Sequence, residues 1–110
     1  MALTEISASS ELDFYLQASP TALLTFSAHW CVNCQKTKPQ LEAMAESYAN
    51  DEDISFAYIP DADMGDFSEV YQISGFPTYV LFVEGAEVGR GANLEAVKAL
   101  IQQHHKPSAS

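Results

Sequence analysis

The feature that most constrains the fold is a pair of cysteines placed directly after a strand-like run. Residues 22–28 form an apolar stretch of strand length, as expected for a strand buried on both faces. Cys31 and Cys34 follow it and open a segment with helical periodicity. Residues three apart share one face of a helix, so these cysteines can form a small reversible disulfide at a helix N-terminus. The pattern predicts a strand, a redox pair and a helix in succession.

The length of the chain and its cysteine content indicate that this pair is reactive and is not a structural disulfide. A chain of 110 residues with 47% hydrophobic residues can form a single domain, 1–110, with its own core. Two cysteines are too few for a disulfide framework, and the ring they close is too small to restrict the unfolded chain much. The cysteine pair is therefore interpreted as redox-active.

The charge balance excludes several classes of partner. Fifteen acidic residues against five basic ones give a formal charge of −10, which repels nucleic acid and anionic membranes. The N-terminus lacks a basic region followed by an apolar one, and no stretch approaches the roughly 18 apolar residues of a membrane-spanning helix. We expect a soluble, cytoplasmic monomer.

Hydrophobic periodicity predicts nine elements in the order β-α-β-α-β-α-β-β-α. The predicted strands cover residues 3–6, 22–28, 54–59, 78–83 and 86–90, and Glu84-Gly85 is the expected hairpin turn. The predicted helices follow a cap at Ser9 or Ser10, Cys31, a possible cap at Asp63, and a cap at Asn93. Residues 104–110 read as a frayed polar tail. This order predicts an α/β fold, a central mixed sheet with helices on both faces.

The position of the cysteines also suggests which of them reacts. At the first turn of a helix, unsatisfied backbone N–H groups and the helix dipole favour a thiolate at Cys31. Such a thiolate can attack another protein's disulfide, and Cys34 can then attack the mixed disulfide and release the reduced partner. We predict Cys31 as the nucleophile and Cys34 as the resolving cysteine.

Over roughly residues 3–103 the chain resembles the thioredoxin family. The matching residues are Phe26, Ala28, Trp30, Cys31, Cys34, Pro39 within the following helix, Gly75-Phe76-Pro77-Thr78 before a strand, and Gly85. The distant Gly-x-Pro-Thr together with Trp-Cys-x-x-Cys is much more specific than either motif alone. The resemblance implies a thioredoxin-like fold and a protein-disulfide reductase. It also implies disulfide-containing protein substrates, electrons from an external thioredoxin reductase, and no cofactor beyond the reversible disulfide.

The same resemblance assigns the residues around the disulfide. Pro77 is expected to be a cis-proline facing the cysteines, and the backbone of Phe76 to pair with the substrate chain. Trp30 is expected to shield the disulfide and to contribute to docking. Two positions depart from the family's pattern: Val32 and Asn33 stand where Gly-Pro is usual, which should alter the reduction potential in an unknown direction.

A buried acid–base pair of the family is missing from this chain. Thr25 stands where the family has a buried Asp that handles the resolving cysteine's proton, and Tyr58 corresponds to its Lys partner. We hypothesise that Cys34 exchanges its proton with solvent or with His29, because histidine has an unperturbed pKa near neutrality.

Other functions are left open by the sequence. The absent Gly-Pro suggests a more oxidising thiol oxidase or isomerase, and a non-catalytic binding module of the same fold is a further alternative. A zinc site of Cys31, Cys34, His104 and His105 fits no compact zinc motif. The acidic run 61–66 departs from the calcium loop spacing and is interpreted as a solvated loop, so no metal site is predicted.

Overall fold

A computed structural model describes residues 3–105 of the chain. Its elements are β1 (Leu3–Glu5), α1 (Ser9–Ala18), β2 (Thr21–Phe26), α2 (Val32–Ser47), β3 (Ile54–Ile59), α3 (Phe67–Val70), β4 (Thr78–Val83), β5 (Ala86–Gly91) and α4 (Leu94–His104). The order is the one predicted. Within residues 3–105, every helix falls short of the length and apolar character that crossing a membrane requires.

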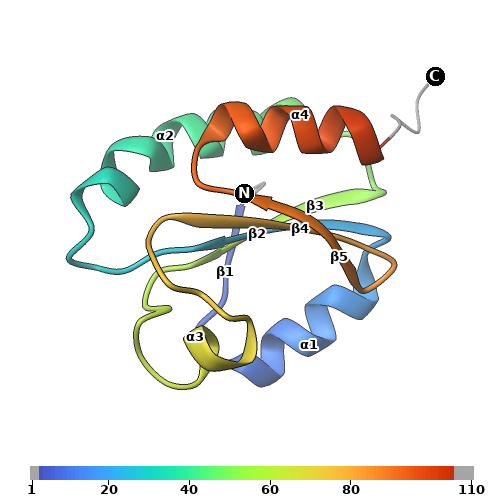
Figure 1. The fold of residues 1–110 in the computed structure, drawn as a ribbon. Coiled ribbons are helices and arrows are strands. Elements are labelled where there is room, and N and C mark those ends of the chain that lie inside the picture. The colour runs from blue at the N-terminus through green and yellow to red at the C-terminus, as the bar shows by residue number, and fades with distance from the viewer. Residues whose placement is uncertain (1–2, 106–110) are drawn as a thin grey trace.

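The strands form one mixed sheet with β2 and β3 near its centre. The strand order is β1-β3-β2-β4-β5. β3 runs parallel to both β1 and β2, whereas β4 is antiparallel to β2 and to β5. Helices α2 and α4 cover one face of the sheet, and α1 and α3 cover the other (Figure 1). The predicted central sheet with helices on both faces is confirmed.

Two hydrophobic cores fill the spaces between the sheet and its helices. Successive residues of a strand point to opposite faces, so each central strand supplies both cores. On the α2 and α4 side Leu23, Phe56 and Leu81 pack against helix residues such as Leu41 and Ile101. On the other side the core consists mainly of Leu24, Phe26, Ala57, Ile59, Val80, Phe82, Leu12 and Phe67. Burial on both faces explains why residues 22–28 read as an apolar run.

Local sequence signals specify some element ends correctly. The Asn93 side chain accepts a hydrogen bond from the Ala96 N–H at 2.9 Å, so it caps α4 as predicted. Glu84 and Gly85 have φ values of 54° and 80°, which is the left-handed conformation of a two-residue hairpin turn. Pro39 lies inside α2 as predicted.

Two predicted caps are wrong. The N-cap of α1 is Ala8, and the Ser9 hydroxyl reaches the Asp66 carboxylate at 3.5 Å. The N-cap of α3 is Asp66, because the Asp63 carboxylate accepts a hydrogen bond from the Trp30 indole. In both cases a contact with a segment distant in sequence takes the side chain away from the local helix end.

Strand β2 also ends earlier than predicted. It stops at Phe26 where its parallel partner β3 reaches Ile59. Beyond that point the Ser27 N–H donates to the Ile59 carbonyl, and the Ala62 N–H donates to the Ser27 carbonyl. These two bonds join the loops that follow β2 and β3.

The predicted tail beginning at His104 is partly wrong. His104 is the last residue of α4, and His105 is buried with a 4% exposed side chain. The His105 Nε2 atom lies 2.8 Å from Asp51 Oδ2, and Nδ1 lies 3.3 Å from Thr21 Oγ1. The tautomer with its proton on Nε2 satisfies both partners. Residues 106–110 of the predicted tail lie outside the described part of the chain.

Replacing His105 with alanine should therefore destabilise the protein. We expect a loss of about 1–3 kcal/mol in the free energy of unfolding, because one buried and one part-buried hydrogen bond are removed together with the packing of the ring. Urea unfolding of His105→Ala beside His104→Ala measures this, since His104 is an exposed neighbour. A frayed tail would make the two variants equally stable, which would contradict the buried placement of His105.

Candidate active site

The two cysteines lie at the N-terminus of α2, directly beyond the end of β2. Cys31 is the N-cap residue of α2 and forms a disulfide with Cys34, with the Cα atoms 5.3 Å apart. The Cys34 N–H points at Cys31 Sγ at 3.1 Å. The two cysteines are 6% and 2% exposed, and Cys34 is the more deeply buried. A backbone N–H group at a helix start favours negative charge on the atom that accepts from it, so this geometry favours a Cys31 thiolate after reduction.

An aromatic surface adjoins the disulfide. Trp30 is 59% exposed and meets Phe76 edge to face, with ring centroids 5.6 Å apart at 85°. Phe76 in turn packs against Ala28 and the two cysteines. The Phe76–Pro77 peptide bond is cis, as the resemblance implied. With the exposed Val32, these residues surround the disulfide with apolar area, and we call Trp30, Val32 and Phe76 the docking surface.

Thr25 and Tyr58 are direct neighbours in the sheet. They are Cα partners in the parallel register of β2 and β3, and Thr25 also pairs with Tyr79 of β4. The Thr25 hydroxyl is buried without a hydrogen-bond partner, whereas the Tyr58 hydroxyl lies 2.9 Å from Ser27 Oγ. Thr25 and Tyr58 therefore stand where the family has its acid–base pair, and Thr25 lies between Tyr58 and Tyr79 in the sheet.

Two titratable side chains near Thr25 and Tyr58 are the phenol of Tyr79 and the ammonium of Lys38. Burial raises the pKa of the Tyr79 hydroxyl, whose neighbour is Thr37 Oγ1 of α2 at 3.3 Å. The Lys38 ammonium lies over the Tyr58 ring, 4.7 Å from its centroid, and pairs with the exposed Glu5 at 3.2 Å. Because the pKa of Tyr79 lies above the ordinary value of about 10, this phenol is protonated at neutral pH and cannot accept the proton that Cys34 must lose.

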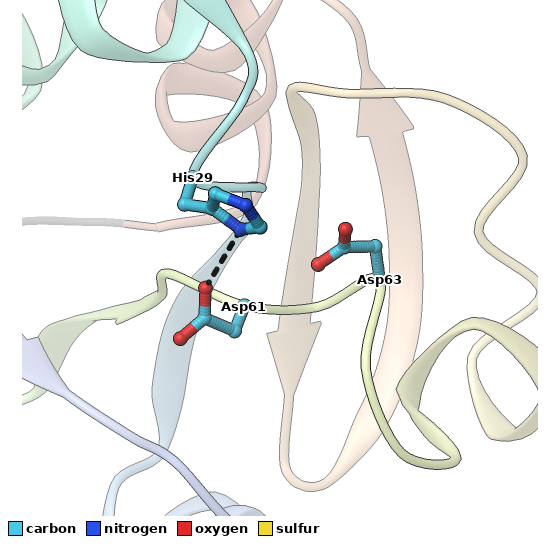
Figure 2. Close-up of side chains that lie close together, drawn as sticks. All are labelled: His29, Asp61 and Asp63. Carbon is cyan, nitrogen blue, oxygen red and sulfur yellow. Dashed lines mark ion pairs between the residues drawn. The ribbon is translucent and has the colours of Figure 1, made fainter.

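Sequence reasoning missed a cluster of side chains beside the disulfide. His29 follows β2, while Asp61 and Asp63 follow β3. His29 Nδ1 lies 3.5 Å from Asp61 Oδ1, with Asp63 close by (Figure 2). The Trp30 indole N–H donates to Asp63 Oδ2 at 2.5 Å. Residues after neighbouring parallel strands meet at one sheet edge, so this proximity could have been found from the predicted topology. His29 pairs with Asp61 in the structure. The predicted exchange of a proton between His29 and Cys34 stays a prediction.

The zinc ligands considered from the sequence are not brought together. Cys31 and Cys34 bond to each other, whereas His105 contacts Thr21 at the start of β2. The cysteines follow the opposite end of that six-residue strand. Six residues of strand span about 20 Å, too far for a shared metal ion.

A mixed sheet with a Cys-x-x-Cys disulfide at a helix start, beside a cis-proline, defines a thiol–disulfide oxidoreductase of thioredoxin-like fold. Comparison with known proteins agrees. The family model described as Thioredoxin matches residues 4–105. Thioredoxin-1 of Saccharomyces cerevisiae is 30% identical over 101 residues, covering 90% of this chain and 95% of that protein. The solved structure of a mutant thioredoxin from Halobacterium salinarum superposes with a TM-score of 0.80 at 30% identity, covering 94% and 91% of the two chains.

The chain belongs to the thioredoxin family and is a protein-disulfide oxidoreductase. Similarity to protein disulfide isomerases is more local. Protein disulfide isomerase-like 1-1 of Arabidopsis thaliana is 39% identical over 67 residues, which cover 60% of this chain and 13% of that protein. The comparisons do not favour the oxidising or the non-catalytic alternative.

Proposed function

We propose that Cys31 is the attacking cysteine in the reduction of disulfides of other proteins, and Cys34 the resolving one. The observation that carries this assignment is the Cys34 N–H directed at Cys31 Sγ, at the N-cap of α2. The substrate is a protein that presents its disulfide beside the docking surface, where the backbone preceding Pro77 can pair with it. The formal charge of −10 makes nucleic acid an unsuitable partner. We propose that the protein acts as a monomer in the cytoplasm.

The exchange balances within the two cysteines and the substrate. The Cys31 thiolate attacks one substrate sulfur, forming a mixed disulfide and releasing the other sulfur as a thiolate. Cys34 loses its proton and attacks Cys31 Sγ, which breaks the mixed disulfide and releases the second substrate sulfur. Two electrons have moved to the substrate, and the Cys31–Cys34 disulfide remains. An external reductase of the thioredoxin reductase type then returns two electrons, and one proton restores the Cys31 thiolate and the Cys34 thiol.

The reduction potential distinguishes a reductase from an oxidant. We expect a reduction potential of about −270 mV, as in thioredoxin, rather than the roughly −180 to −120 mV of protein disulfide isomerase and stronger oxidants. Equilibration of the protein in buffers of defined redox poise, followed by alkylation of free thiols, measures it. A reduction potential of roughly −180 to −120 mV would show that the protein is an oxidase or isomerase and not a reductase. The exchange between Cys31 and Cys34 would be the same in either case.

The residues between the cysteines offer a matched variant. Val32→Gly with Asn33→Pro installs the family's usual pair without touching either cysteine. Any difference in potential between this variant and the natural chain measures what the Val32-Asn33 pair contributes.

A further inference from the structure

We propose that His29, Asp61 and Asp63 form a zinc-binding site at the rim of the redox site. One imidazole nitrogen and two carboxylate oxygens, one from each residue, all lie within 4.8 Å of one another. Histidine nitrogen and aspartate oxygen are ordinary zinc ligands, and three protein ligands plus water complete a tetrahedron. The nitrogen is what separates this cluster from an acidic surface patch, because hard cations such as calcium favour oxygen ligands.

The spacing of the ligand atoms suits one small ion. Two ligand atoms bound to a tetrahedral zinc ion lie roughly 3.3 Å apart. His29 Nδ1 and Asp61 Oδ1 are already 3.5 Å apart, so they need almost no movement. In Figure 2 the Asp63 carboxylate faces the same gap from the other side. A small shift of one exposed side chain closes the third bond.

The backbone holds these ligands in place. The loops that follow β2 and β3 are joined by hydrogen bonds from the Ser27 N–H to Ile59 and from the Ala62 N–H to Ser27. Ala62, between the two aspartates, is fully buried. The Trp30 indole N–H bonds one oxygen of Asp63 and leaves the other free to bind metal. Both loops are therefore fixed before an ion arrives, which reduces the entropy lost on binding.

The net charge of the protein favours the binding of a divalent cation at this site. The protein carries a formal charge of −10, which raises the local concentration of divalent cations at its surface. Zinc bound here is not a reactant in disulfide exchange. It lies beside Trp30 and cross-links the two loops that flank the docking surface.

Zinc titration of the oxidised 110-residue protein tests the proposal. In that state both cysteines are held in the disulfide and offer no thiolate to the metal. We expect one zinc ion to bind per chain by isothermal titration calorimetry at pH 7. We also expect a saturable change in the fluorescence of Trp30, the single tryptophan, because its indole contacts Asp63. His29→Ala and Asp61→Asn should each weaken binding at least about tenfold.

Matched variants keep the experiment decisive. Asp63→Asn retains an oxygen acceptor for the Trp30 indole but removes the charge, and it should weaken zinc binding as well. His104→Ala, an exposed histidine at the end of α4, should bind zinc like the natural protein. The proposal is overturned by the absence of saturable binding up to about 1 mM zinc. It is equally overturned by binding that survives His29→Ala or that calcium competes away at equal concentration.

Discussion

Cys31→Ser should lower the rate of protein-disulfide reduction by at least about a thousandfold, to the uncatalysed background. A serine hydroxyl stays protonated at neutral pH and cannot attack a disulfide, whereas the thiolate at the N-cap of α2 can. Turnover of oxidised insulin with a chemical reductant in excess measures the loss. Cys34→Ser should also abolish turnover, because the mixed disulfide it forms is not resolved.

His104→Ala is the control for this assay, since that exposed side chain at the end of α4 is remote from the cysteines. It should reduce the substrate at the natural rate. Residual multiple turnover by Cys31→Ser would mean that Cys34 or another group attacks the substrate, and the assignment of the nucleophile would fall.

Thr25→Asp should lower the free energy of unfolding by about 4 kcal/mol at pH 7. Thr25 is 2% exposed between Tyr58 and Tyr79, so burial raises the pKa of an introduced carboxyl by about 3 units, at about 1.36 kcal/mol for each. The folded-state pKa then lies above the unfolded value of about 3.9. The variant's stability is therefore retained below about pH 4 and lost as pH rises through the folded-state pKa.

Thr25→Val is the matched control for the carboxylate. It has the same shape but removes a buried hydroxyl that lacks a hydrogen-bond partner. We expect it to stabilise the protein by about 1 kcal/mol without a new pH dependence. Urea unfolding at pH 5, 6, 7 and 8 compares the three proteins. A Thr25→Asp variant whose stability relative to the natural chain is the same at every pH would show that the position is open to water.

Much of the fold was predictable because it depends on local sequence patterns. The apolar runs of the buried strands β3 and β4, the Asn93 cap and the left-handed Glu84-Gly85 turn are each encoded within a few residues. The cysteines at the start of α2 follow from the same local pattern. The cis bond before Pro77 came from the family resemblance, since sequence alone does not specify it.

The errors lie where distant segments meet. His105 looked like part of a polar tail, but its hydrogen bonds are with Asp51 and Thr21, more than fifty residues earlier. Asp63 looked like a helix cap, but its partner is the Trp30 indole. Polar side chains have many alternative partners, and which of them is nearby depends on the assembled sheet. The cysteines of the candidate site were thus predictable from the sequence, and the cis bond before Pro77 from the resemblance. The contacts that join His29 to Asp61 and Trp30 to Asp63 were not.

The most direct test of dithiol exchange is to trap its intermediate. Reduced Cys34→Ser and Cys31→Ser are each mixed with an equimolar disulfide-bonded protein, and the products are separated without reductant and weighed by mass spectrometry. We predict a covalent one-to-one adduct with Cys34→Ser that dithiothreitol reverses, and none with Cys31→Ser. An adduct formed faster by Cys31→Ser, or at equal rates by both, would contradict the assignment of Cys31 as the attacking cysteine.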